Sequence, residues 1–496
     1  MKSFILRLLI SLPIGFVLAF GFGYLFLDLP NRLFIDQVLL VSFATAASGY
    51  LTFSFIESRA EILNSLSVKR PAFSLKGFPA ILREHAAGLL LGFLFFGIYT
   101  YIGLKLNRPT VDTVDNFLDA DNTSWMLRIA DPAGGGFEMR GPHPFAYFIL
   151  RPLGWTFNLF TQSISLSAIL INTLTGGLCV FLTWVLIKNL TGNKNYALLI
   201  ACLLGLSTAH IFFGSVIESY IFSAAALIGF TLLLQSKKDS MASLVAGGLL
   251  TFGITLTNFM QNLIGFVVVR PKLRDIIRFA GLTISFGILL SILHAAIYPS
   301  SKLFFLPSDV QAEEEFGYSI FNEPAWRAVG RVILLVRTIL LYTVIAPEPY
   351  VLVGEVGGTF PRFNFFKIVP GTFSYSSYDG LGNVLIMTWA GLLLVSGIFF
   401  LYRFIRTRQA GLGSVFVLCL LFNFILHLNY GYEPFLYSPD WAYAVIFFVA
   451  VSLAPLAEKR VFQGGLFAFL MLLAYNQFHF FQFIFKTIAP FSGQGN

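Results

Sequence analysis

Charged residues are scarce in this chain of 496 residues. Asp, Glu, Lys and Arg together make up 12% of it, whereas soluble globular proteins contain roughly 25%. Hydrophobic residues supply 56%, and apolar runs of about 20 residues, long enough to cross a hydrocarbon core of about 30 Å, recur along the chain. The sequence therefore predicts an all-α polytopic membrane protein, since a transmembrane barrel would show short alternating segments.

Cysteines and cofactor motifs are also scarce. The three cysteines, Cys179, Cys202 and Cys419, all fall inside apolar runs, which indicates packing residues and no disulfide framework. The chain has no Walker lysine motif, glycine-rich dinucleotide fingerprint or HExxH motif, so neither a nucleotide motor nor a soluble-type cofactor domain is indicated. No cofactor is required by the sequence, and a divalent metal is left undetermined.

The basic residues that produce the net charge of +8 gather in short loops, as the positive-inside rule expects. Lys2 and Arg7 place the N-terminus in the cytoplasm, with an uncleaved first helix, and the C-terminus falls outside. We expect about thirteen transmembrane helices, near 8–27, 35–56, 86–104, 164–188, 196–214, 217–235, 241–257, 259–270, 276–298, 382–402, 411–428, 440–456 and 461–483.

Two long polar segments fall outside in this topology. The first, residues 105–162, should carry a short interfacial helix near 143–160. The second, residues 299–381, contains a basic amphipathic piece at 326–345 that we expect against the membrane surface. We divide the chain into two N-terminal helices with a cytoplasmic loop (1–85), a transmembrane module (86–460), and a last helix with a short outside tail (461–496).

The first outside segment concentrates charge in the stretch LDADNTSWMLRIADPAGGGFEMRGPHP. Asp119 and Asp121 precede an expected short helix. Either carboxylate could cap that helix, or act as a general base that takes a proton from an acceptor hydroxyl. Residues 132–136 are rich in glycine and indicate a hinge or turn.

The motif RGPHP, residues 140–144, ends the same stretch. Arg140 can hold a phosphate by two parallel hydrogen bonds, and His143 can donate to a phosphate or shuttle a proton. Flanking prolines fix the backbone around His143. The alternative is a rigid, solvated turn before an interfacial helix.

Two later groups also fall outside in the predicted topology. Glu218, in GSVIESYIF, stands at the outer end of a helix, where an ionisable residue suggests function but also suits the helix dipole. The stretch HLNYGYEPFLYSPDW, residues 427–441, is rich in aromatic residues and carboxylates. These side chains suit sugar faces and hydroxyls, and they also suit an interfacial aromatic belt.

The order of Asp121, Asp131, Arg140 and His143–Pro144, after an early membrane helix, resembles the first outside loop of the GT-C superfamily, especially its bacterial members. Two features depart from better-known relatives: Pro144 is followed by Phe145 rather than proline, and Asn122 stands in place of a second acid. The resemblance implies an inverting hexosyl or pentosyl transferase of a bacterial inner membrane. It would move sugar from a polyprenyl-phosphate donor to a lipid, glycan or protein acceptor, with its active site outside and no nucleic-acid partner.

The resemblance also distributes roles among residues of this chain. Asp121 would be the general base, with Asp119 as the next candidate, and three residues would line the acceptor or sugar site: Tyr430, Glu433 and Tyr437. Residues expected to contact the donor phosphate or sugar are Asp131, Arg140, His143, Glu218, Tyr220, Arg362 and Lys367. The competing prediction is a transporter or lipid flippase, which would place ionisable residues along a path at mid-membrane.

Overall fold

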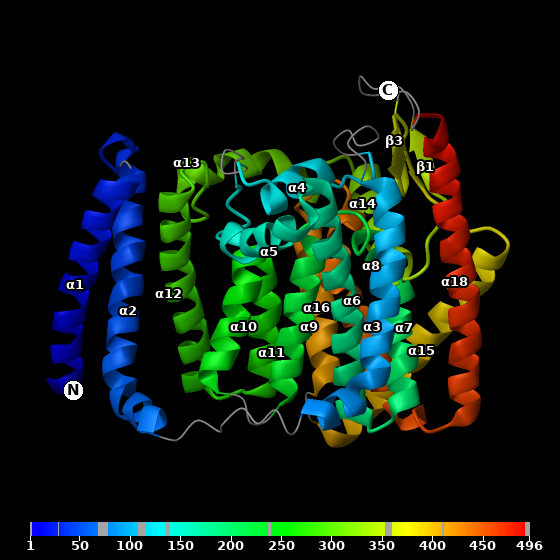
Figure 1. The fold of residues 1–496 in the computed structure, drawn as a ribbon, viewed down its shortest axis with the longest axis horizontal. Coiled ribbons are helices and arrows are strands. Elements are labelled where there is room, and N and C mark those ends of the chain that lie inside the picture. Colours follow the sequence, from blue (N-terminus) through cyan, green and yellow to red (C-terminus); the bar gives the residue numbers. More distant parts are fainter. Residues whose placement is uncertain are drawn as a thin grey trace.

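The fold is a bundle of roughly parallel helices, as the computed structural model shows (Figure 1). The structure describes residues 2–27, 29–67, 78–107, 116–133, 139–236, 240–352, 360–408 and 411–491. Part of the glycine-rich stretch 132–136 and most of the basic loop 58–84 lie outside the described residues or have undescribed side chains.

Long helices run the length of the bundle and shorter ones stand beside them (Figure 1). The bundle helices are α1 (Lys2–Phe26), α2 (Phe34–Ser67), α3 (Phe78–Leu106), α6 (Ile164–Thr191), α7 (Lys194–Leu206), α8 (Thr208–Phe213), α9 (Tyr220–Gln235), α10 (Met241–Ile254), α11 (Phe259–Val269), α12 (Leu273–Ile297), α15 (Leu381–Thr407), α16 (Leu412–Leu428), α17 (Pro439–Ser452) and α18 (Arg460–Ile488).

Six helices among the described residues are long and apolar enough to cross a membrane, and shorter apolar helices accompany them. The six stretches are Phe34–Ile56, Leu82–Leu106, Ile164–Thr191, Leu273–Ile297, Leu381–Thr407 and Arg460–Phe491. The prediction of a helical membrane protein is thereby confirmed. The count of about thirteen spans remains a prediction, because helices as short as α7, with 13 residues, reach the required length only together with their neighbours.

Local sequence signals explain where several helices begin and end. The Ser163 hydroxyl accepts a hydrogen bond from the Leu166 amide and caps the start of α6, whose end is closed by Gly192 with φ of +70°. Asn193 then caps α7 in the same way. Such caps satisfy backbone groups that have no partner within the helix, so the short turn between α6 and α7 is well specified.

Helices α3 and α6 cross closely because both carry glycine at the crossing. A Cβ on Gly92 would stand 2.9 Å from the Gly177 carbonyl oxygen, and one on Gly177 would stand 2.6 Å from the Gly92 oxygen. Small residues allow this approach between helices in a membrane. The crossing holds α3 against α6, and α3 leads directly into the first polar segment.

The polar segments gather at one end of the bundle, here called the loop end (Figure 1). The loop end comprises α4 (Asn122–Ala130), α5 (Ala146–Thr161), α13 (Pro307–Val310), α14 (Ala325–Arg337), β1 (Tyr350–Leu352), β2 (Arg362–Asn364), β3 (Phe366–Val369) and β4 (Thr372–Tyr375). The two outside segments of the predicted topology therefore lie together. The other end, where α6 turns into α7 and α12 begins, is called the turn end.

The loop end contains two small antiparallel hairpins that sequence analysis did not predict. Strand β1 pairs with β2, with Val351 opposite Phe363, and β3 pairs with β4. The expected amphipathic piece at 326–345 is present as α14, extended by a π-helical turn at Thr338–Tyr342. Helix α14 packs on α16 and on β4.

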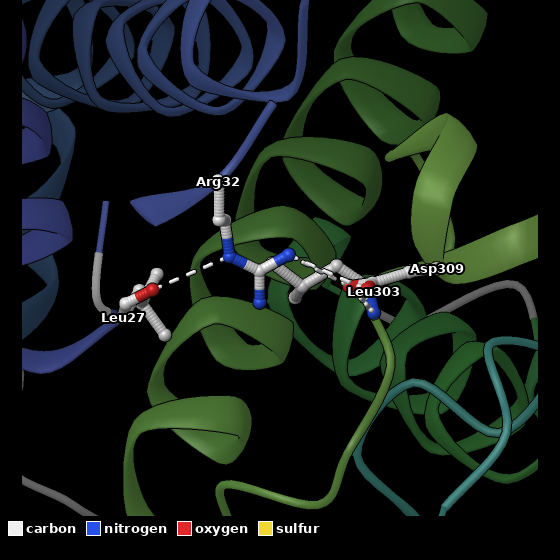
Figure 2. A network of polar contacts seen from close by, with 4 residues as sticks. All are labelled: Leu27, Arg32, Leu303 and Asp309. Atoms are coloured by element: carbon white, nitrogen blue, oxygen red, sulfur yellow. Dashed lines mark hydrogen bonds and ion pairs between the residues drawn. The ribbon is translucent and has the colours of Figure 1, made fainter. Parts of the chain in front are cut away.

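The N-terminal pair α1 and α2 stands at the side of the bundle, with α2 packed against α12 (Figure 1). Figure 2 shows how the turn between the two helices is tied to the loop end. Arg32 donates to the Leu27 carbonyl and to both oxygens of Asp309, each at 3.3 Å, and Asp309 also accepts from the Leu303 amide. This ion pair is partly buried and fixes the start of α13, which helps to form the cavity described next.

Candidate active site

A cavity of about 530 Å³ lies at the loop end, within the range of 300–1,000 Å³ typical of small-molecule sites. Segments far apart in sequence form its wall, including residues 139–143, 255–258 and 426–440. Its polar lining is rich in acids and tyrosines: Asp119, Asp121, Glu218, Glu313, Glu315, Asp440, Arg128, Arg140, His143, His427, Tyr220, Tyr430, Tyr432 and Tyr437.

Most of the residues predicted to form the site meet in this cavity. Those that line it are Asp119, Asp121, Arg140, His143, Glu218, Tyr220, Tyr430 and Tyr437. Those that do not line it are Asp131, Arg362, Lys367 and Glu433. These residues come from positions as far apart as Asp119 and Tyr437, and all of them fall on one side of the predicted membrane.

Asp119 is held by the second polar segment. Arg362, at the start of β2, donates to its Oδ1 at 2.5 Å. The two polar segments also pair through their backbones. The Leu118 amide donates to the Phe363 carbonyl at 3.1 Å, and the Phe363 amide donates to the Asn116 carbonyl at 2.8 Å. Burial raises the pKa of Asp119, and the positive charge of Arg362 counteracts part of this rise.

The backbone at Asp119 is strained. Leu118 and Asp119 have φ of +56° and +68°, in the left-handed region that non-glycine residues rarely adopt and that costs about 1–3 kcal/mol per residue. The paired backbone on either side keeps the chain in this conformation. The bend turns the chain from the β2 contact into the cavity just before Asp121, so the strain falls at the candidate base.

Asp121 occupies the N-cap position of α4 but makes no side-chain capping bond. The capping interpretation is therefore wrong for this residue. Its backbone amide donates instead to Glu218 Oε1 at 2.9 Å. The carboxylate lines the cavity, where it can meet a ligand.

Glu218 lies between α8 and α9 and is only 1% exposed. Its second oxygen accepts from the Ser219 amide at 2.7 Å. Burial raises the pKa of Glu218 to about 8, and the negative charge of nearby Asp121 adds to the rise. Burial therefore favours the neutral form of Glu218, and two accepted amide bonds hold its carboxyl group beside Asp121.

Arg140 is already engaged by an acid that sequence analysis did not single out. Its guanidinium donates from Nε to Glu313 Oε1 at 2.8 Å and from Nη2 to Glu313 Oε2. The Tyr430 hydroxyl donates to Glu313 Oε2 at 3.2 Å, and the Phe316 ring lies 3.8 Å beneath the guanidinium carbon. Two-pronged binding of a phosphate by Arg140 would therefore require Glu313 to move.

His143 has a fixed tautomer. Its Nδ1 lies 2.6 Å from the Ile254 carbonyl oxygen, which accepts only if Nδ1 carries the proton. Burial lowers the pKa of His143 to about 3, with the charges of Arg140 and Arg128 adding to the effect. The ring is therefore neutral at pH 7 and its Nε2 is an acceptor, so His143 suits a hydroxyl donor better than an anionic phosphate.

The late aromatic loop is organised by Arg331 of α14. The guanidinium donates to four backbone carbonyls of the loop, at His427, Tyr430, Gly431 and Tyr432. Gly431 has φ of +77°, and a Cβ there would stand 2.4 Å from the Tyr437 ring. Only glycine lets Tyr437 pack into the loop, where its ring packs at a tilt against His427 with ring centroids 4.4 Å apart.

Glu433 supports this loop from outside the cavity. It is 4% exposed, and its Oε1 accepts from the Phe435 amide at 3.1 Å at the start of a short 3-10 turn. Burial raises the pKa of Glu433 to about 8, with the charge of Asp119 contributing. The residue predicted to line the acceptor site is thus placed one layer behind the cavity.

Asp131 and Lys367 also stand apart from the cavity. Asp131 ends α4, and its Oδ1 accepts from the Ala133 amide at 2.8 Å, which makes a local turn. Its carbonyl accepts from Arg151 at 3.0 Å. Lys367 is on β3, opposite Ser374 of β4.

Several polar residues of the site carried no readable sequence signal. Glu313 stands in a run of three glutamates, a pattern typical of solvated surface, and Arg331 is one of several basic residues on an amphipathic helix. Arg128 lines the cavity and stacks over Trp125. Among the described residues, no group of three or more His, Cys, Asp or Glu is placed to hold a metal ion, so no step is derived through one.

Comparison with known proteins gives little to add to this geometry. No protein family and no curated protein matches the chain. Among solved structures, the apo oligosaccharyltransferase of Archaeoglobus fulgidus is similar to it, with 15% sequence identity and a TM-score of 0.39. The match covers 81% of this chain and 56% of that one, so the chain corresponds to about half of that enzyme's length. This similarity is too low to carry an argument about function, so the function is argued from the residues that line the cavity.

Proposed function

We propose that the protein is an integral membrane glycosyltransferase of GT-C type. It would move a sugar from a polyprenyl-phosphate donor to a lipid, glycan or protein acceptor, with inversion of the anomeric centre. The observation that supports this most is the cavity at the loop end. It is lined by tyrosines, by two arginines and by Asp121, whose carboxylate makes no helix-capping bond. Carboxylates and aromatic rings suit sugar hydroxyls and faces, and the arginines supply charge for a leaving phosphate.

The reaction would be a single displacement. Asp121 accepts the proton of the acceptor hydroxyl as that oxygen bonds to the anomeric carbon. The bond from this carbon to the phosphate oxygen breaks with its electron pair, and polyprenyl phosphate leaves from the opposite face. Arg128 and Arg140 line the cavity and would offset the developing negative charge. The donor carries its own leaving group, so the missing nucleotide motifs fit this proposal.

Protonation of Glu218 fits the same scheme. A neutral Glu218 keeps a second negative charge away from Asp121 and from the departing phosphate. His143 Nε2, an acceptor at pH 7, would orient a hydroxyl of the sugar or the acceptor. Arg362 acts on Asp119 rather than on the phosphate, and holds it beside the base.

The membrane orientation follows from charge. Lys188 and Lys194 flank the turn between α6 and α7, and Arg270, Lys272 and Arg274 precede or begin α12, all at the turn end. Positive loops favour the cytoplasm, so we place the loop end and its cavity outside the cytoplasmic membrane of a bacterium.

The second candidate is a transporter or lipid flippase. The buried ionisable Asp440 near the start of α17 is the observation that favours it. The other acids of the cavity belong to loops and helix ends, whereas a transport path calls for ionisable groups across the membrane. The enzyme is therefore the better supported function.

Purified protein in detergent would be given radiolabelled polyprenyl-phosphate glucose, mannose, galactose or arabinose, with and without a membrane lipid extract as acceptor. The proposal predicts release of polyprenyl phosphate that requires the extract. No release from any donor, together with donor movement across reconstituted vesicles, would support the flippase instead.

A further inference from the structure

Asp440, in the first turn of α17, is an acid of the cavity that the mechanism above does not use. It lines the cavity and is only 3% exposed. No described residue donates a hydrogen bond to its Oδ1. A buried carboxylate oxygen without a donor costs about 1–3 kcal/mol, so its retention needs a reason.

The surroundings of Asp440 are polar and joined by hydrogen bonds. The side chains of Asn258 and Ser223 are hydrogen-bond partners of its carboxyl group, so only Oδ1 is left without a donor among the described residues. Gln261 donates to its backbone carbonyl at 3.1 Å. Asn258 in turn donates to the Ser223 hydroxyl at 2.6 Å, and Gln261 to the Asn258 amide oxygen at 2.7 Å. The network joins α9, α11 and α17, so hydrogen bonds from two other helices hold Asp440 in place.

The cavity beside Asp440 has the composition of a sugar subsite. The Thr255 hydroxyl lines the cavity and also has no partner among the described residues. Tyr220 and Tyr437, with ring centroids 5.3 Å apart and edge to face, form an aromatic wall next to them. Aromatic faces with a few fixed polar groups are what orient a small polar ligand in a largely apolar pocket.

We propose that Asp440 accepts a hydrogen bond from a hydroxyl of the transferred sugar and so selects which sugar is transferred. The inference rests on the proposed function. It adds that the sugar of the donor is recognised by Asp440 and the neighbouring tyrosines. Asp440 would be a buried specificity residue, whereas Asp121, which is partly exposed, would act as the base. A site built around a buried acceptor discriminates strongly against an analogue that lacks the matching hydroxyl, because the acceptor is then left unpaired.

The test compares the best donor found among polyprenyl-phosphate glucose, mannose, galactose and arabinose with each of its monodeoxy analogues. Wild-type protein should transfer one monodeoxy analogue with a kcat/KM lower by roughly 10–100-fold, as for loss of a hydrogen bond to a charged group. Asp440→Leu should transfer the complete sugar as slowly as that analogue and lose the discrimination. Equal discrimination in wild type and Asp440→Leu would overturn the inference and leave the glycosyltransferase standing.

Asn423→Leu is the matched control. Asn423 is 1% exposed on α16, and its amide oxygen also has no donor among the described residues, but it does not line the cavity. This variant should discriminate as wild type does. Loss of discrimination in Asn423→Leu as well would show a general effect of buried polar groups and overturn the inference.

Thermal unfolding separates recognition from structural support. If Asp440 serves a ligand, Asp440→Leu should unfold without ligand at the wild-type temperature or above it, since an unpaired buried acceptor is removed. A clearly lower unfolding temperature in both Asp440→Leu and Asp440→Asn would assign the residue to structure and overturn the inference. If wild type releases nothing from any donor, the proposed function fails. The inference is then tested by the rise in unfolding temperature that each donor causes: a rise in wild type but not in Asp440→Leu supports it, and equal rises overturn it.

Discussion

Two walls of the cavity carry acids in opposite circumstances. One, the acidic wall, consists of Asp119, Asp121 and Glu218. Among the residues that the structure describes, only Asp119 of these three forms an ion pair, with Arg362. The other, the paired wall, consists of Arg140, Glu313 and Tyr430, in which Glu313 forms an ion pair with Arg140 and accepts a hydrogen bond from Tyr430. On the acidic wall a proton replaces the missing cation, because burial raises the pKa of Glu218 to about 8.

The difference separates chemistry from support. A carboxylate with no capping bond and no ion pair to a described residue, as at Asp121, can accept a proton from a substrate. A carboxylate shared between an arginine and a tyrosine, as at Glu313, holds the wall in place and sets the position of Arg140. The same residue type therefore has different roles according to its neighbours, and variants of the two walls should behave differently.

The largest effect should come from Asp121→Asn. It removes the proposed base and keeps the shape of the side chain, so kcat for transfer should fall by about 10²–10⁴-fold, the usual contribution of one general base. Thermal unfolding should change little, since Asp121 makes no capping bond. Release of polyprenyl phosphate measures the first effect. Normal release by Asp121→Asn, together with its loss in Asp119→Asn, would move the base to Asp119.

The paired wall should distinguish Arg140→Gln from Glu313→Gln. Each breaks the ion pair and should destabilise the fold by about 1–3 kcal/mol, because a partly buried group loses its charged partner. Arg140→Gln should also lower transfer by roughly 10–100-fold, as one charge that stabilises the leaving phosphate is lost.

Glu313→Gln keeps the positive charge of Arg140. Its transfer rate should therefore stay about tenfold or more above that of Arg140→Gln. Unfolding in detergent and initial transfer rates give both quantities. Equal loss of transfer in the two variants would mean that the paired wall only supports the fold.

A smaller effect is expected from pH. The raised pKa of Glu218 means that it is neutral below about pH 8 and becomes charged above it. Transfer should decline several-fold as pH rises through this value, since a new negative charge opposes the departing phosphate. Glu218→Gln stays neutral at every pH, so the decline should vanish in its pH profile; an unchanged profile would separate Glu218 from the reaction.

The smallest effect should come from Lys367→Gln. Lys367 lies on β3 and does not line the cavity. Stability should stay within about 0.5 kcal/mol, as for most surface substitutions, and donor transfer should change less than about twofold. A tenfold loss would extend the site to the β3–β4 hairpin.

The sequence predicted two kinds of feature: the helices, which follow from the length of the apolar runs, and the polar segments that share one side of the predicted membrane. It located most of the helices. It grouped Asp121, Arg140 and His143 through the resemblance of one polar loop, and the charge of the loops placed Glu218 on the same side. It could not pair side chains across 150 residues or more. Glu313 therefore escaped notice, and so did the contact of Arg362 with Asp119.

The short strands were missed for a related reason. Strands of three or four residues, such as β1 and β3, are too short to show an alternating pattern. The backbone contact of Leu118 with Phe363 depends on the strained turn at residues 118 and 119, which no local propensity favours. The two polar segments thus define each other's conformation only in the folded chain.

The most direct test of the role of Asp121 is chemical rescue of Asp121→Ala by formate. The substitution opens space for a small carboxylate in the place of the lost side chain. We expect transfer by Asp121→Ala to be nearly absent without formate and to rise with its concentration, while Asp119→Ala gains nothing. Wild-type transfer by Asp121→Ala in the absence of formate would contradict the account.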